Sequence, residues 1–348
     1  MGERSRAWDA DVARAILEFF DHRHRALPWR DTDDPYRIWV SEVMLQQTRV
    51  ETVIPYYERW VARFPDLRRL AAAPEDDVLA AWAGLGYYSR ARNLHTAARH
   101  VHERLGGDVP RTAAALRELP GVGAYTAGAI ASIAFGEPAP AIDGNARRVL
   151  SRLLDADLAP AALHEAGRAL VPDERPGDFN QGLMELGATV CTPRRPRCAD
   201  CPVGHLCRAR AAGTQLLRPA PKTRRAPPRF RFATLVAHTR THVLLERRSE
   251  RLLRGLWCFP ATPVESDVAA TGAAALRSIL RTRRPAEALG MVEHAFSHRT
   301  EIYDVYRVAL PRRPRLSTQR DWQWTPIDGL PALALPAAQR RIAALAGL

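Results

Sequence analysis

The chain has 348 residues, of which 46% are apolar and 26% are charged, and it carries a formal net charge of +13. This length allows about two domains, and the composition is typical of a globular protein rather than a disordered or fibrous one. The sequence has neither an apolar run long enough to span a bilayer nor a signal-peptide core at its start, so we expect a cytoplasmic, nucleoid-associated protein without a membrane partner. The charge favours a nucleic-acid partner, because neutralising phosphates releases counterions, although a solvated basic surface would give the same charge.

Residues 1–217 have the pattern of an all-helical domain. Apolar residues recur at three- and four-residue spacing in segments such as 12–20, 38–45 and 78–82, whereas strand-like runs are scarce. The acids and the proline at 33–35 are typical of a helix start.

Within this domain, a glycine-containing turn precedes a helix of small residues. The turn has the sequence LPGVG at 119–123, and AYTAGAI follows at 124–130. Such a turn exposes backbone N–H groups beside a helix N-terminus, where a phosphate can bind. Gly121 and Gly123 are therefore candidate contacts to a nucleic-acid backbone, although ordinary helix connections share this pattern.

Four of the five cysteines follow one another with the spacing C-x6-C-x2-C-x5-C. Disulfides are disfavoured in an intracellular protein, so this clustering indicates thiolates that converge on a metal. Four cysteines suit either a zinc ion or a [4Fe-4S] cluster, and the spacing does not separate the two. Unligated thiols are the less favoured alternative, because loops broken by proline bury cysteine poorly. The four candidate ligands are Cys191, Cys198, Cys201 and Cys207.

Residues 218–231 read RPAPKTRRAPPRFR, which is typical of an extended linker. Beyond it the pattern changes to short β-type runs at 232–238, 242–245 and 301–310, with one helical segment at 268–280. The sequence therefore predicts a second, α+β domain over residues 232–348.

The cysteine spacing at the end of an all-helical domain resembles that of the endonuclease III superfamily of helix-hairpin-helix DNA glycosylases. The turn and helix over about residues 112–135 resemble the hairpin of the same superfamily. This resemblance implies a [4Fe-4S] cluster in the loop 191–207, with a structural role rather than a catalytic one.

Four further stretches resemble the adenine DNA glycosylase (MutY) branch of that superfamily. They are LPWR at 27–30, SEVMLQQTRVETVIPYY at 41–57, GLGYYSRAR at 84–92 and IDGNARRV at 142–149. The second domain resembles the MutT-like, Nudix-related domain of this branch. The resemblance implies a multidomain protein, with an all-α glycosylase domain and a C-terminal Nudix-like α+β domain. It also implies a monomer that acts in base excision repair on adenine:8-oxoguanine or adenine:guanine mispairs in double-stranded DNA.

The single lysine of the chain bears on the type of glycosylase. Bifunctional relatives carry a lysine just after the hairpin, where its amine forms a Schiff base with the sugar, but here Tyr125 occupies that position. The only lysine, Lys222, lies in the predicted linker. We therefore expect a monofunctional enzyme that hydrolyses the N-glycosidic bond with water.

Two carboxylates can divide the chemistry of adenine removal. Glu42 lies in an apolar helical segment, where desolvation can keep it protonated as the general acid. Asp143 lies at a helix start, where we expect it to remain ionised and to stabilise, or transiently attack, the cationic sugar. On the residues alone, a helical glutamate usually faces solvent and such an aspartate is usually an N-cap. The resemblance to the family favours the catalytic roles.

The resemblance also implies supporting residues around these two. Tyr125 and Asn145 would support the sugar and Asp143, whereas Gln181, Trp29 and Arg30 would line the adenine pocket. Flipping a base out of the duplex costs a few kcal/mol of stacking, so protein side chains must fill the gap that the base leaves. Gln47 and Tyr87 match the wedge residues, and they are flanked by Leu45, Thr48 and Leu85.

In the second domain, Phe296, Ser297 and His298 match the loop that recognises 8-oxoguanine, although a plain hairpin turn has the same features. The segment 273–277 reads AAALR instead of the acidic Nudix helix, so we expect no nucleotide hydrolysis there. Two alternatives are an endonuclease III-like oxidised-pyrimidine glycosylase with lyase activity, against which Tyr125 and the second domain argue, and a non-catalytic iron-sulfur DNA-binding protein. A third, a Nudix hydrolase with a helical appendage, is disfavoured by the missing acidic helix.

Overall fold

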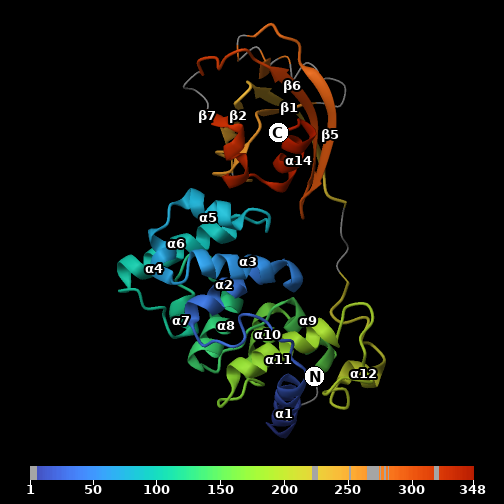
Figure 1. Cartoon of the computed structure of the whole chain (residues 1–348). Coiled ribbons are helices and arrows are strands. Elements are labelled where there is room, and N and C mark those ends of the chain that lie inside the picture. Colours follow the sequence, from blue (N-terminus) through green and yellow to red (C-terminus); the bar gives the residue numbers. More distant parts are fainter. Residues whose placement is uncertain are drawn as a thin grey trace. The chain divides into compact units, whose positions relative to one another are not determined.

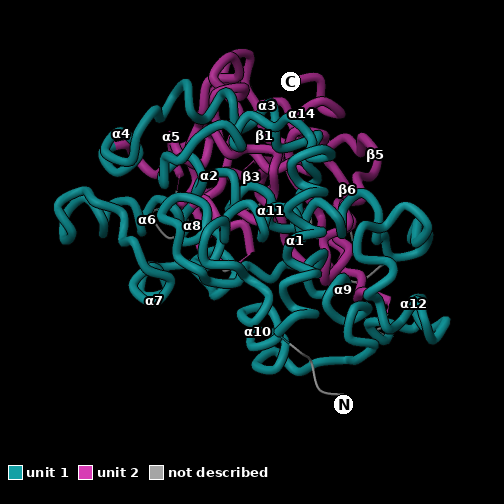
Figure 2. The backbone as a smooth tube through the Cα atoms, turned by 90° about the horizontal axis from the view of Figure 1, so that it is seen from below, with its two compact units in different colours: residues 1–72, 92–223 teal, residues 73–91, 224–348 magenta. Residues whose placement is uncertain are grey.

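The computed structural model divides into two compact units (Figure 1, Figure 2). The helical unit comprises residues 1–72 and 92–223, and the sheet unit comprises residues 73–91 and 224–348. One boundary falls inside the segment 218–231, four residues of which, including Lys222, lie outside the described part of the chain. The structure describes residues 6–221, 226–250, 252–264, 274, 276–277, 280, 282–316 and 321–348.

Every described element before residue 218 is a helix, which confirms the predicted all-α domain (Figure 1). Helix α2 begins where the sequence indicated, because the Asp34 side chain accepts the N–H of Tyr36 and Pro35 occupies the first turn. The helices are α1 Arg6–Arg23, α2 Pro35–Leu45, α3 Val50–Arg63, α4 Leu67–Ala72, α5 Glu75–Trp82, α6 Ser89–Arg104, α7 Ala113–Leu116, α8 Ala124–Phe135, α9 Gly144–Leu153, α10 Pro160–Arg168, α11 Pro176–Thr189 and α12 Arg208–Ala212.

Helix α11 is central to the helical unit, because α1, α8 and α9 all pack against it. Its residues Phe179, Leu183 and Leu186 are buried in a core that also includes Ile16 of α1 and Leu150 of α9. Burying such large apolar side chains contributes roughly 1.5–3 kcal/mol each. The packing therefore provides a rigid base for polar side chains that point from the same helices into a cavity.

One polar side chain of α11 orients the chain segment before α9. The buried amide of Asn180 donates to Ser132 Oγ at 2.9 Å and to the Ala139 carbonyl at 2.8 Å, and its oxygen accepts the Ala141 N–H at 3.0 Å. Because all of these groups are buried, losing the amide would leave unpaired donors and acceptors. Asn180 thus fixes the main chain that leads into α9.

Helix α8 contacts that same segment through its backbone. A Cβ atom built on Gly128 would lie 2.2 Å from the Pro140 carbonyl oxygen. Only glycine permits this approach, which brings the main chain leading to Asp143 directly against α8.

The described strands of the sheet unit form one mixed sheet with the order β3-β2-β1-β6-β5, in which β4 also pairs with β1 and β7 with β2. Strands β1 and β6 are parallel, and the other pairs are antiparallel. The strands are β1 Arg229–His238, β2 His242–Arg247, β3 Trp257–Cys258, β4 Ala261–Pro263, β5 Glu287–Ala295, β6 Thr300–Ala309 and β7 Trp322–Pro326.

Helical elements complete this unit and confirm its α+β class. The 3-10 helix η1 spans Ile327–Ala332, and α14 spans Ala337–Leu345. Ile342 of α14 packs with Val236 and Val305 on one face of the sheet, whereas the neighbouring Leu235 belongs to the core on the other face. Most of the predicted helix 268–280, including residues 273 and 275 of the AAALR segment, lies outside the described residues.

The turn between β5 and β6 contains residues 296–298, and the Phe296 N–H donates to the Arg299 carbonyl at 2.8 Å. Across the described ranges, no helix is both long and apolar enough to cross a membrane.

Candidate active site

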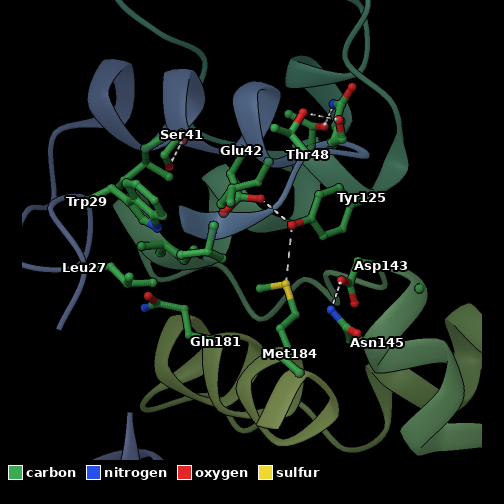
Figure 3. Close-up of a pocket in the computed structure, with 18 of the residues that line it drawn as sticks. Leu27, Trp29, Ser41, Glu42, Thr48, Tyr125, Asp143, Asn145, Gln181 and Met184 are labelled. Atoms are coloured by element: carbon green, nitrogen blue, oxygen red, sulfur yellow. Dashed lines mark hydrogen bonds between the residues drawn. The ribbon is translucent and has the colours of Figure 1, made fainter. Parts of the chain in front are cut away.

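A cavity of about 670 Å³ opens in the helical unit, and Figure 3 shows part of its lining. Residues of α2, α8 and α11 line it, together with the segment 143–145 at the start of α9. It brings together twelve of the residues singled out from the sequence, which are far apart along the chain. They are Trp29, Arg30, Glu42, Leu45, Gln47, Thr48, Gly121, Gly123, Tyr125, Asp143, Asn145 and Gln181.

Glu42 lies on α2 and is only 5% exposed. The Tyr125 hydroxyl donates a hydrogen bond to Glu42 Oε2, and it also lies 3.3 Å from Met184 Sδ (Figure 3). Burial raises the pKa of Glu42 to about 7, although the Tyr125 hydrogen bond opposes this rise. The nearby charge of Asp143 raises the Glu42 pKa further. This carboxyl group is therefore protonated in a large fraction of molecules at neutral pH.

Asp143 is the N-cap of α9, and both of its oxygens are engaged. Oδ1 accepts the Ala146 N–H at 2.7 Å, and Oδ2 accepts the Asn145 side-chain amide at 2.9 Å. Burial raises the pKa of Asp143, whereas the hydrogen bonds from Ala146 and Asn145 lower it. The N-cap interpretation is thus confirmed, and the capping position also presents the carboxylate to the cavity.

Behind Asn145, the Arg148 side chain joins three segments of the helical unit. Its guanidinium group donates to Asn145 Oδ1 at 2.9 Å, to the Gly187 carbonyl at 2.8 Å and to the Cys191 carbonyl at 2.8 Å. Gly187 is tightly placed, since a Cβ atom there would lie 2.6 Å from the Asn145 Cβ. Sequence reasoning missed Arg148, although it lies within the IDGNARRV stretch.

The cavity lining also contains an ion-pair network around the buried Glu185, which the sequence did not reveal. Glu185 of α11 accepts hydrogen bonds from Arg30 at 2.6 Å and from Arg25 at 2.7 Å. Burial alone would raise the pKa of Glu185, but these two guanidinium groups hold it below its ordinary value. Trp29, which also lines the cavity, packs against Tyr57 in a T-shaped arrangement with 5.3 Å between the ring centroids.

The predicted hairpin is formed by α7, the turn and α8. Gly121 adopts the left-handed backbone conformation (φ +77), and a Cβ atom there would lie 2.5 Å from Asn93 Cβ. Leu119 and Ile130 are buried beneath the turn, whereas Gly121 and Gly123 are exposed. No side chain caps the N-terminus of α8, so its first N–H groups are open to an anionic ligand.

The two residues singled out as wedges share an unusual backbone conformation. Gln47 (φ +56) and Tyr87 (φ +47) both lie in the left-handed region, and both are exposed. Tyr87 follows Leu85, which is buried, in the connection between α5 and α6. Among the described residues, Leu85 and Tyr87 are not part of the cavity lining.

The four clustered cysteines line one small cavity. Arg152 donates to Cys191 Sγ at 3.2 Å, and the thiol of Cys207 lies 3.3 Å from the Arg152 carbonyl. Gly204 closes the loop, since a Cβ atom there would lie 3.0 Å from the carbonyl oxygens of both Cys198 and Cys201. Within the described ranges, no group of three or more cysteine, histidine or acidic side chains is arranged to hold a metal ion.

In the sheet unit, the β5–β6 turn presents Ser297 and His298 to solvent, whereas Phe296 is half-buried. The Phe296 ring contacts His294 edge-on, with 4.6 Å between centroids. Cys258, which lies far along the sequence from the other four cysteines, is 3% exposed and packs in the interior of the sheet unit.

Comparison with known proteins agrees with this arrangement. Residues 40–170 match the HhH-GPD superfamily of base excision DNA repair proteins, and residues 232–345 match the NUDIX domain. The adenine DNA glycosylase of Mus musculus is 38% identical, with 94% of this chain and 76% of the relative covered. The corresponding enzyme of Homo sapiens is 42% identical, with 87% of this chain and 68% of the relative covered.

Solved structures match the helical part of the chain. A thermostable thymine-DNA glycosylase has a TM-score of 0.56 and 33% identity, with 59% of this chain and 98% of that chain covered. A trapped endonuclease III–DNA covalent intermediate has a TM-score of 0.53 and 25% identity, with 61% and 99% covered. With its hairpin, its cavity and its relatives in agreement, the chain belongs to the adenine DNA glycosylase family of base excision repair enzymes, which hydrolyse N-glycosidic bonds in DNA.

Proposed function

We propose that this glycosylase releases adenine from adenine:8-oxoguanine and adenine:guanine mispairs in double-stranded DNA, by hydrolysis and without a Schiff base. The observation that carries this proposal is that Glu42 and Asp143 line one cavity, with Glu42 hydrogen-bonded to Tyr125. The relatives named adenine DNA glycosylases support adenine as the released base.

In this mechanism Glu42 donates a proton to N7 of adenine as the base departs. A pKa near 7 suits this role, because the group is protonated in much of the population and still gives up its proton readily. The hydrogen bond from Tyr125 fixes the orientation of the carboxyl group. After the base leaves, the Glu42 carboxylate accepts a proton from the attacking water.

Asp143 would offset the positive charge that develops on the deoxyribose. Its carboxylate is held by the Ala146 N–H and the Asn145 amide, so it does not have to reorganise during the reaction. Either electrostatic stabilisation or a transient covalent bond to the sugar is compatible with this position, as in glycoside hydrolysis.

Trp29, Arg30 and Gln181 would contact the extruded adenine. The cavity volume of about 670 Å³ lies within the usual range for small-molecule sites, roughly 300–1,000 Å³. Gln47 and Tyr87 would fill the space that the flipped base leaves in the duplex, with Leu45, Thr48 and Leu85 beside them. Gly121 and Gly123 would bind the DNA backbone through main-chain N–H groups.

The four cysteines are proposed to hold a [4Fe-4S] cluster that braces the basic loop 191–207. They line one cavity, and Gly204 leaves room for the loop to close around it. Such a cluster would supply structural cross-linking of this loop. The iron content and visible absorption of the purified protein test the proposal.

Ser297 and His298 are proposed to recognise 8-oxoguanine. Both are exposed on the β5–β6 turn, and a hydroxyl and an imidazole can pair with donors and acceptors on a damaged base edge.

A single-turnover assay on a panel of duplexes tests the proposal. Wild-type protein should release adenine from an adenine:8-oxoguanine duplex and leave the strand intact until alkali is added. Glu42→Gln should lower the release rate about 10²–10⁴-fold, because the acid is lost, and should still bind the duplex. The matched control is Glu58→Gln, which removes an exposed carboxylate of α3 and should react normally.

The runner-up is an endonuclease III-like glycosylase with lyase activity, which the fold of the helical unit also accommodates. Thymine-glycol and thymine:guanine duplexes in the same panel separate the two functions. Strand cleavage without alkali, or trapping by borohydride, would contradict the monofunctional proposal. A non-catalytic DNA-binding protein would bind every duplex and release no base.

A further inference from the structure

The connection between α5 and α6 keeps Tyr87 in a conformation that non-glycine residues rarely adopt. Its φ angle is +47, and the residue is 42% exposed. Gly84 (φ +110) and Gly86 (φ +73), which precede it, are also in the left-handed region. Such a backbone conformation persists only when the surrounding structure enforces it, so other groups must hold this segment.

Arg90, at the start of α6, contacts this segment at several points. Its guanidinium carbon lies 5.4 Å from the centroid of the Tyr87 ring and 5.3 Å from that of the Trp82 ring. One of its nitrogens donates to the carbonyls of Leu85 at 3.3 Å and Gly86 at 3.2 Å. Arg90 therefore contacts the ring of Tyr87 and the two main-chain carbonyls just before it.

Further hydrogen bonds hold the same segment. The Trp82 indole N–H donates to the Gly86 carbonyl at 3.1 Å, and the Arg90 main-chain N–H donates to the Tyr87 carbonyl at 2.9 Å. Arg90 is only 8% exposed, so its guanidinium group is largely removed from solvent. Burial lowers the pKa of Arg90 to about 10, which leaves the group charged at neutral pH and the cation–π contacts intact.

We propose that Arg90 is a positioning residue that holds the Tyr87 ring ready for insertion beside the mispair. This inference rests on the wedge role proposed for Tyr87 above. A ring that is already ordered in the free protein loses less conformational entropy on binding, so the complex forms more tightly. A planar guanidinium group can contact two rings and donate to carbonyls at once, which an ammonium group does not reproduce.

The first experiment compares Arg90→Met and Arg90→Lys with a matched control on the same helix, Arg99→Met. Arg99 is exposed and pairs with Glu103, so its loss removes the same charge without touching Tyr87. Affinity is measured with a duplex that pairs 8-oxoguanine with a non-cleavable adenosine analogue. We expect Arg90→Met and Arg90→Lys to weaken binding about tenfold, through lost preorganisation, and Arg99→Met to weaken it less than about twofold.

A double-mutant cycle then decides whether Arg90 acts through Tyr87. Arg90→Met should change the affinity less than about twofold when Tyr87→Ala is already present, because interacting residues are not additive. Full additivity would overturn the inference, as would normal affinity of both Arg90 variants. Thermal unfolding is measured in parallel, and if Arg90→Met fails to fold, Arg90→Lys carries the cycle.

The cycle also separates this inference from the wedge role itself. Normal affinity of Tyr87→Ala alone would remove the wedge role, and the positioning role of Arg90 with it. If Tyr87→Ala weakens duplex binding and the Arg90 substitution still has its full effect in the Tyr87→Ala background, only the positioning role is contradicted.

Discussion

The cavity of the helical unit and the β5–β6 turn of the sheet unit differ in how they present their polar groups. In the cavity, Glu42 is almost fully buried and Asp143 has both oxygens engaged. On the turn, Ser297 and His298 face solvent. Proton transfer benefits from desolvated, fixed groups, whereas recognition of a base edge requires groups that the DNA can reach. We therefore expect substitutions in the cavity to alter rate, pH dependence and stability, and substitutions on the turn to alter selectivity alone.

Beside the loss of the acid in Glu42→Gln, the largest effect on the reaction rate is expected for Asp143→Asn. The change keeps the shape of the side chain and its position at the start of α9 but removes the carboxylate that the proposed mechanism places beside the sugar. We expect the single-turnover rate of adenine release to fall about 10³-fold, as for the loss of a preorganised electrostatic group. Duplex affinity, measured alongside, should change much less. A rate within tenfold of wild type would contradict the role of Asp143.

Glu42→Gln tests the cost of keeping an acid buried. The pKa of Glu42 is raised from 4.5 to about 7 in the folded protein, so the native state holds this proton more tightly and loses stability as pH rises from about 4.5 through 7. Glutamine lacks that penalty, and at pH 8 the variant should be more stable by up to about 3 kcal/mol. Denaturant unfolding at pH 5 and pH 8 measures the difference. Equal stability of the two proteins at both pH values would show that Glu42 is not desolvated.

Tyr125→Phe is expected to move the pH profile of the reaction. In the proposed mechanism, adenine release requires protonated Glu42, so we expect the rate to fall as pH rises through about 7. The Tyr125 hydrogen bond lowers the Glu42 pKa, and its loss should shift this descending limb to higher pH. We expect the plateau rate to drop about tenfold, because the carboxyl group is less well oriented. If the descending limb of the pH–rate profile stays at the same pH, the coupling between Tyr125 and Glu42 is contradicted.

The smallest effect is expected for Ser297→Ala combined with His298→Ala. The preference for 8-oxoguanine over guanine opposite adenine should fall about tenfold, the value of one lost base-edge contact. The plateau rate on adenine:guanine should not change, and thermal stability should shift by less than about 0.5 kcal/mol, as for exposed positions. An unchanged preference would remove the reading role from this turn.

Local signals explain what the sequence could predict. Asp34 and Pro35 mark the start of α2, the small residues after Gly123 mark α8, and the spacing of Val43, Met44 and Leu45 around Glu42 indicates its burial. Each of these signals lies within a few residues of the feature that it predicts. The family resemblance then identified the partners that meet in the cavity.

Long-range pairing explains what could not be predicted. Glu185 meets Arg30 across 155 positions of sequence, and a helical glutamate next to Leu186 has no local mark of an ion pair. Arg148 is one of many arginines in the chain, and only the fold brings it to the Cys191 carbonyl. Strand β5 was missed because it is mostly exposed and is interrupted by Gly290 at an irregularity in its pairing with β6.

The contact between Gly128 and the Pro140 carbonyl limits how this enzyme can diversify. Through it, the helix that bears Tyr125 and the segment that leads to Asp143 meet main chain to main chain, without an intervening side chain whose size could vary. Substitutions elsewhere can reshape the walls around the base, but they leave the separation of these two elements unchanged. We therefore expect redesign toward a different nucleobase to depend on residues of the cavity lining such as Trp29 and Gln181, while α8 and the segment before Asp143 keep their positions.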